Sequence, residues 1–100
     1  MKSPEECQSI EEVRECIDAL DREMIRLIRD RLEYARAIVR FKSDEEGIIA
    51  RPRYESVLRE RRKLAMEKGL DPDVIERMYR IMMDYFIEEE LKIFRNNNKK

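Results

Sequence analysis

The chain has 100 residues, in which 22 Lys and Arg nearly balance 23 Asp and Glu, and its formal net charge is -1. Such a balance excludes the strongly positive field with which proteins attract nucleic acid or an anionic membrane. Its longest apolar run is too short to cross a bilayer, and the acidic start, residues 1–6, lacks the apolar stretch of a signal peptide. We therefore expect a cytoplasmic protein of one domain, covering 1–100, with neither a membrane nor a nucleic-acid partner.

The residue types favour helices and exclude several kinds of site. The sequence has two Gly, three Pro and 45% charged residues, a composition typical of an all-α fold. It has no His, and its two cysteines, Cys7 and Cys16, are too few for a zinc site, so we expect no metal and two reduced thiols. No Gly-rich phosphate loop is present, and we expect no cofactor.

A first helix is predicted from about residue 10 to about residue 41. Ser9 and Glu12 fit the S-x-x-E capping box that marks a helix start. Apolar residues then follow two interleaved heptad series, which favours one continuous helix with a coiled-coil-like seam. One series is Ile10, Ile17, Met24, position 31 and Ile38, and the other is Val13, Leu20, Leu27, Tyr34 and Phe41.

The length of this helix predicts a dimer. About 32 residues at about 1.5 Å each give a rod of about 48 Å. A compact domain of this size, with a radius of gyration of about 13 Å, is only about 35 Å across. Since the rest of one chain is too small to cover both ends of the seam, we expect a second copy to supply the missing surface.

Two shorter helices should follow. Residues 42–52 break the periodicity and are predicted as a loop, of a length often found in functional lids. A helix over 53–68 should end at Gly69, and the pair Asp71-Pro72 should open a third helix over 72–95. Residues 96–100 have no apolar anchor, and we expect them to be frayed.

Charged residues interrupt the apolar stripes at a few positions. Arg31 occupies a seam position of the first helix, Arg14 lies at the edge of that seam, and Lys42 ends the helix. Glu89 and Glu90 interrupt the apolar face of the third helix. Because an isolated buried charge costs several kcal/mol, these groups either pair internally, for example Arg31 with Glu90, or line a pocket for a carboxylate ligand. Both readings stay open from the pattern alone.

The residue types also limit the chemistry of such a pocket. Without His, the usual base for a Ser or Cys nucleophile is missing. A reaction accelerated by conformational restraint and fixed positive charge is what the composition leaves.

These residues resemble a known family, the helical chorismate mutases. The resemblance rests on Val13-Arg14-Glu15, Ile17-Asp18, Leu20-Asp21, Arg31, Tyr34 and Phe41-Lys42. It implies three helices per chain, one of them very long, in an intertwined homodimer whose two sites use residues of both chains. It also implies a small dicarboxylate substrate.

Within the family, the likeness is strongest to the isochorismate pyruvate lyase branch, which forms salicylate for siderophore biosynthesis. It rests on Met1-Lys2, Pro4-Glu5, Cys7, Arg40-Phe41-Lys42, Gly69-Leu70-Asp71, Ile87 and Lys92. By this resemblance, Arg31 and the partner chain's copy of Arg14 hold the two carboxylates, and Lys42 stabilises charge at the ether oxygen. The other residues implied to contact the substrate are Arg53, Ile87 and Glu90.

Two departures bear on the activity. Mutases of the family usually have Glu after the arginine of the second helix, whereas here Tyr54 follows Arg53, which favours the lyase. The family commonly has Gln where this chain has Glu90, and a Glu must be protonated to donate a hydrogen bond there. The alternatives are a chorismate mutase, converting chorismate to prephenate, and a non-catalytic helical dimerisation module.

Overall fold

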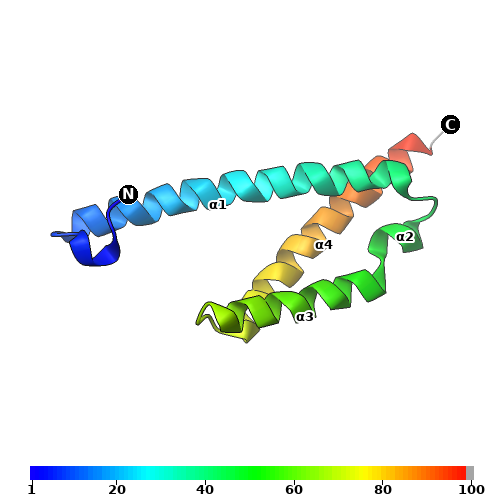
Figure 1. Cartoon of the computed structure of the whole chain (residues 1–100). Helices are drawn as coiled ribbons and strands as arrows, with labels where there is room; N and C mark the ends of the chain where they lie inside the picture. Colours follow the sequence, from blue (N-terminus) through cyan, green and yellow to red (C-terminus); the bar gives the residue numbers. More distant parts are fainter. Residues whose placement is uncertain (99–100) are drawn as a thin grey trace. The chain divides into compact units, whose positions relative to one another are not determined.

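The computed structural model describes residues 1–98 and is all-α in that range, as predicted. Figure 1 shows the elements in chain order. Three long helices dominate, and their bounds and those of the shorter elements are η1 Pro4–Glu6, α1 Ile10–Ile38, η2 Val39–Phe41, α2 Glu45–Ile49, α3 Arg51–Glu67 and α4 Pro72–Asn97. The chain divides into two compact units, residues 1–33 and the part from Tyr34 onward. The single-domain organisation stays a prediction.

The start of α1 differs in detail from the expected capping box. Ser9 caps the helix, because its Oγ accepts a hydrogen bond from the Glu12 amide at 3.1 Å. The Glu12 carboxylate, however, accepts from the Gln8 amide at 2.7 Å and from Lys2 Nζ at 3.0 Å. The second half of the predicted box is therefore replaced by contacts to the preceding residues, which fold back on the helix.

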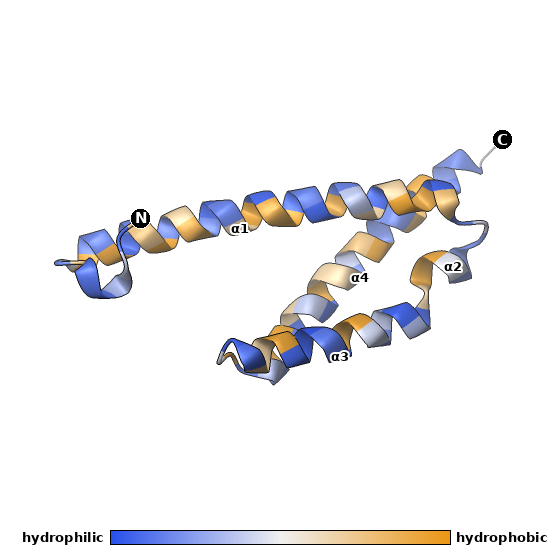
Figure 2. Cartoon of the chain, in the orientation of Figure 1, coloured by the Kyte–Doolittle hydropathy of each residue, from blue (hydrophilic) through white to orange (hydrophobic). Residues whose placement is uncertain are grey.

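The apolar residues of α1 are largely exposed within the chain. Figure 2 shows hydrophobic segments recurring along the whole length of this helix. The exposed fractions of the seam residues are 57% for Ile10, 40% for Val13, 49% for Ile17, 54% for Leu20, 47% for Met24 and 53% for Leu27. An amphipathic helix usually buries such a stripe.

The segment predicted as a loop over 42–52 contains a helix. Asp44 caps α2 by accepting a hydrogen bond from the Gly47 amide at 2.7 Å. Ala50 then adopts a left-handed conformation, with φ of 44° and ψ of 59°. Its amide donates to Glu46 O at 2.8 Å and its carbonyl accepts from the Tyr54 amide at 2.9 Å. One residue therefore ends α2 and opens α3, which is why α3 begins at Arg51 rather than 53.

The second unit has its core between α3 and α4. A buried cluster of Tyr54, Val57, Leu58 and Met83 packs against Tyr79 and Ile87. Gly69, at φ of +75°, ends the turn after α3, where the Leu70 amide donates to Ala65 O at 2.8 Å.

The ends of α4 have side-chain caps. At its start, Asp71 accepts a hydrogen bond from the Asp73 amide at 2.9 Å. At its far end the helix continues to Asn97, beyond the predicted end at 95, because Asn98 caps it by donating from Nδ2 to Phe94 O at 2.8 Å. The predicted frayed tail, 96–100, is therefore helical in its first two residues, and positions 99 and 100 lie outside the described range. Among the described residues, no helix has the length and apolarity needed to cross a membrane.

Candidate active site

The predicted site residues are distributed over both units. Arg14, which is exposed, and Arg31, which is half-buried, lie on α1 in the first unit. Lys42, Arg53, Ile87 and Glu90 lie in the second unit, where the structure places three of them on neighbouring segments. Ile87 and Glu90 are three residues apart on α4 and therefore share a face. Lys42 directly follows η2, which packs against α4. Arg53 is exposed in the first turn of α3.

Lys42 is held at the junction of two short helical segments. Its amide donates to Val39 O at 3.1 Å and so ends η2, while its own backbone turns extended. The half-buried side chain runs beside α2, since a Cβ added at Gly47 would lie 3.5 Å from Lys42 Cδ and 3.1 Å from Asp44 Oδ1. Glycine at position 47 therefore leaves room for both the cap and the lysine.

An ion pair fastens α2 to α4. Arg95 donates to the Glu45 carboxylate through Nη2 at 2.8 Å and through Nε at 3.2 Å. This two-pronged geometry is the strong arrangement for a guanidinium and a carboxylate. The hydrogen bond from Arg95 lowers the pKa of Glu45 below its usual value of 4.5. The segment that carries Lys42 is thus attached to the helix that carries Glu90.

Glu90 is the one buried charged residue among residues 1–98, with 6% of its surface exposed. Its neighbour Glu89 has a different environment, because it forms ion pairs with Arg36 at 3.7 Å and Lys92 at 3.2 Å. Burial of a carboxyl group excludes water around it, which strengthens any hydrogen bond that the group makes to a ligand. The alternative that Glu90 pairs internally with Arg31 stays a prediction.

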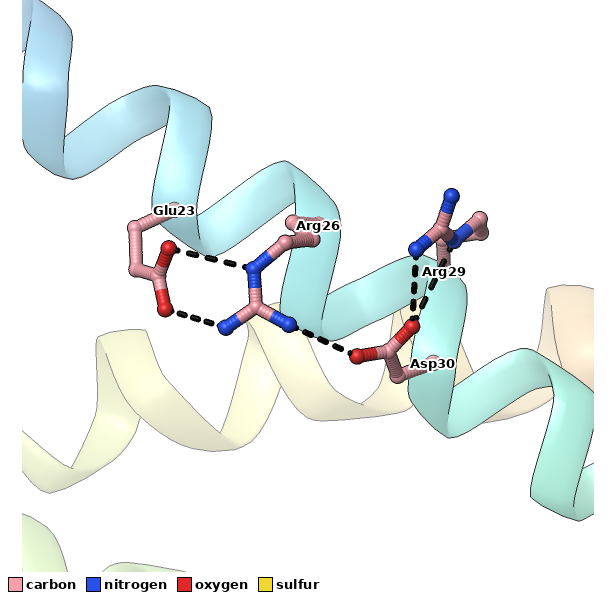
Figure 3. Close-up of polar contacts among 4 residues, drawn as sticks. All are labelled: Glu23, Arg26, Arg29 and Asp30. Atoms are coloured by element: carbon pink, nitrogen blue, oxygen red, sulfur yellow. Dashed lines mark hydrogen bonds and ion pairs between the residues drawn. The ribbon is translucent and has the colours of Figure 1, made fainter.

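The charged residues of α1 that precede Arg31 form an ordinary helix surface. In Figure 3, Arg26 lies between Glu23 and Asp30, and Arg29 also contacts Asp30. Arg26 donates from Nε to Glu23 at 3.1 Å and from Nη1 to Asp30 at 2.9 Å. The opposite charges of these side chains are paired with one another at the surface, so we assign no ligand to them.

The position after Arg53 is part of the core. Tyr54 is 7% exposed, and its hydroxyl donates to Asp84 Oδ1 at 2.8 Å. Burial, together with the hydrogen bond to Asp84, raises the pKa of the tyrosine above 10.0. The side chain at this position is thus used to join α3 to α4.

Sequence reasoning missed the residues that position Lys42, namely Asp44, Glu45, Gly47 and Arg95. An Asp followed by two Glu is a helix-start signal that was available. The five residues of α2 are too few to show a helical period, and a contact 50 residues apart in sequence leaves no local pattern.

Comparison with known proteins assigns the class. The chorismate mutase type II family matches residues 13–91, and the chain belongs to that family. A relative named isochorismate pyruvate lyase, from Pseudomonas aeruginosa, is 35% identical over 95 residues, which are 95% of this chain and 94% of the relative. Family membership agrees with an enzyme that acts on a small molecule.

Proposed function

We propose that this protein is an isochorismate pyruvate lyase that acts in the cytoplasm, converting isochorismate to salicylate and pyruvate. The observation that carries the proposal is the 35% identity, over nearly the whole of both chains, to a protein of that name. In the reaction, the ring–oxygen bond to the enolpyruvyl group breaks while a ring hydrogen moves to the enolpyruvyl methylene carbon. The ring becomes aromatic and no nucleophile is needed, which suits a chain without His.

The site residues then have the following roles. Arg31 and the partner's Arg14 each hold one carboxylate, which selects the reactive conformer. Lys42 stabilises the negative charge that develops at the ether oxygen, and its support by α2 and Arg95 suits a cation that must be in place before the reaction. Arg53 and Ile87 complete the contacts to the substrate. We expect neither a metal nor a cofactor.

Direct assay of the two substrates tests the proposal. Purified protein is mixed separately with isochorismate and with chorismate, and salicylate fluorescence and prephenate are measured. Salicylate should form from isochorismate, and this activity should fall more than about tenfold in Lys42→Ala and in Arg31→Ala. Lys63→Ala and Arg29→Ala, at exposed positions of α3 and α1, are the matched controls and should retain activity. Prephenate without salicylate would instead establish a chorismate mutase, the second candidate within the family.

Shared sites require a homodimer, and the exposed stripe of α1 suits a second copy of the chain. Mixing two inactive variants tests this arrangement. When Arg14→Ala and Arg31→Ala chains form a mixed dimer, one of its two sites contains both arginines. After random exchange, about a quarter of the wild-type activity should return, since half of the dimers are mixed. Recovery of no activity, with exchange verified by mass, would refute the sharing of sites.

Glu90 is proposed to donate a hydrogen bond to the ether oxygen in its protonated form. An ordinary Glu has a pKa of about 4.3, so turnover should rise as the pH falls from about 8 to about 5. Glu90→Gln donates at every pH in this range and should therefore flatten the profile. A wild-type profile that is already flat, or one that the variant leaves unchanged, would remove Glu90 from this role.

A further inference from the structure

Two thiols, one before α1 and one within it, both contact the first residues of the chain. Lys2 forms an ion pair with Glu12 at 3.0 Å, which folds the start of the chain back along the first turns of the helix. Cys7 Sγ donates to Ser3 O at 3.6 Å, and Cys16 Sγ donates to Lys2 O at 3.9 Å. Two adjacent carbonyl groups thus accept hydrogen bonds from two cysteines that are nine positions apart in sequence.

These two hydrogen bonds bring the two thiols near each other. Cys16 also contributes to raising the pKa of the Cys7 thiol, and both residues are half-buried and unpaired in the reduced chain. A disulfide requires a sulfur–sulfur distance of about 2.0 Å and compatible backbone positions. Because the two thiols donate to the carbonyl groups of the consecutive residues Lys2 and Ser3, both sulfur atoms lie beside the same short stretch of backbone, and rotation of the side chains supplies the remaining approach.

We propose that Cys7 and Cys16 form a reversible disulfide within one chain, which fixes residues 1–8 to the start of α1. A low-molecular-weight disulfide such as oxidised glutathione is the oxidant. One protein thiolate attacks it, forms a mixed disulfide and releases one reduced thiol. The second protein thiolate then attacks the protein sulfur and releases the other. In sum, two protein thiols lose two protons and two electrons, and the oxidant becomes two thiols.

The environment of the two thiols slows their reaction with an oxidant. Burial raises the pKa of the Cys7 thiol, and Cys16 and Glu12 raise it further, while Lys2 opposes them. Since only the thiolate attacks a disulfide, few molecules react at a given moment at neutral pH. The cross-link therefore forms under sustained oxidation and reopens with reductant. It does not depend on the proposed enzymatic activity.

The position of Arg14 gives a direct test, because trypsin separates the two cysteines. Cleavage after Lys2, Arg14 and Arg22 places Cys7 in peptide 3–14 and Cys16 in peptide 15–22. The full-length folded protein is incubated with oxidised glutathione, alkylated and analysed by intact mass and by non-reducing digestion. We expect a chain lighter by two hydrogens, with no alkylated cysteine, and the two peptides linked until reductant is added.

Matched variants and an unfolded control separate geometry from general reactivity. Cys7→Ser and Cys16→Ser each have one thiol and should accumulate one glutathione adduct instead of losing two hydrogens. In the same glutathione buffer, the ratio of internal cross-link to glutathione adduct should be several-fold lower for the urea-unfolded wild type than for the folded protein, because this ratio reports the closure step and not the first attack. Two glutathione adducts on the folded wild type, a disulfide between two chains, or the same ratio of cross-link to adduct in the folded and unfolded states would overturn the proposal.

Discussion

Replacement of Leu20 by Ala tests whether the stripe of α1 is buried by a second copy of the chain. Leu20 is 54% exposed in the single chain, so about half of its surface is available to a partner. Complete burial of a Leu side chain contributes about 1.5–3 kcal/mol, and the available half therefore contributes about 1 kcal/mol. A symmetric interface contains the residue twice, which makes about 2 kcal/mol per dimer. This loss corresponds to a dimer dissociation constant about 30-fold higher.

Ile25→Ala is the matched control for this substitution. Ile25 is 67% exposed on the same helix but lies outside both heptad series. The two variants remove apolar surface and place Ala, a strong helix former, in α1, so helix content should not fall in either. Sedimentation equilibrium gives the dissociation constant, and urea unfolding at several protein concentrations gives the stability of the dimer. If Leu20→Ala associates as tightly as Ile25→Ala, or if the wild type is a monomer, the reasoning is refuted.

Three further predictions concern the second unit. Tyr54→Phe should lower the free energy of unfolding by about 1 kcal/mol through loss of the hydrogen bond to Asp84. Tyr85→Phe, at a position of α4 that is 51% exposed, should have no effect in the same urea titration. Ala50→Gly should raise the free energy of unfolding by about 0.5 kcal/mol, because it removes the cost of a left-handed alanine. Ala19→Gly, in the interior of α1, should lower the free energy of unfolding by about 1 kcal/mol. Equal effects of the two substitutions would contradict the argument. Arg95→Gln should lower the thermal midpoint near pH 7, and the difference from wild type should vanish as the pH falls toward about 3. The reason is that the lowered pKa of Glu45 stabilises the fold above the ordinary Glu pKa, and this contribution is lost as the carboxylate is protonated. A difference that persists in acid would point to another cause.

The helices could be predicted from the sequence wherever their signals are local. The heptad pattern and Ser9 define α1, and Asp71 with Pro72 defines the start of α4. In contrast, α2 depends on a cap at Asp44 and on a left-handed residue at position 50. The sequence has Ala there and not the Gly that would indicate such a turn. The hydrogen bonds on both sides of position 50 therefore impose this conformation, and no residue type in the sequence indicates it.

The candidate site was predictable as a set of charges and not as an arrangement. A carboxylate or a guanidinium on an apolar stripe is visible in the sequence, and Glu90 is indeed buried. The adjacent Glu89 forms ion pairs with Arg36 and Lys92 instead, and the sequence does not distinguish the two neighbouring carboxylates. The stripe of α1 shows the same limit. The sequence reveals its apolar seam residues, but it does not reveal which surface covers them, and they are exposed in the single chain.

The proposed role of Lys42 as a fixed cation, in a reaction that needs no nucleophile, depends on how the segment around it is held. A fixed cation lowers a barrier only if it needs no reorganisation when charge develops on the substrate. Three features restrict the segment that follows Lys42. They are the cap at Asp44, the close approach of Lys42 and Asp44 to the backbone that Gly47 permits, and the ion pair between Glu45 and Arg95. Each is local to α2 or joins it to α4, so the segment beside the lysine is attached to one helix of the second unit. Loosening any of them should therefore lower turnover while the core of Tyr54, Val57, Leu58 and Met83 stays folded, which is the behaviour expected of a positioned charge.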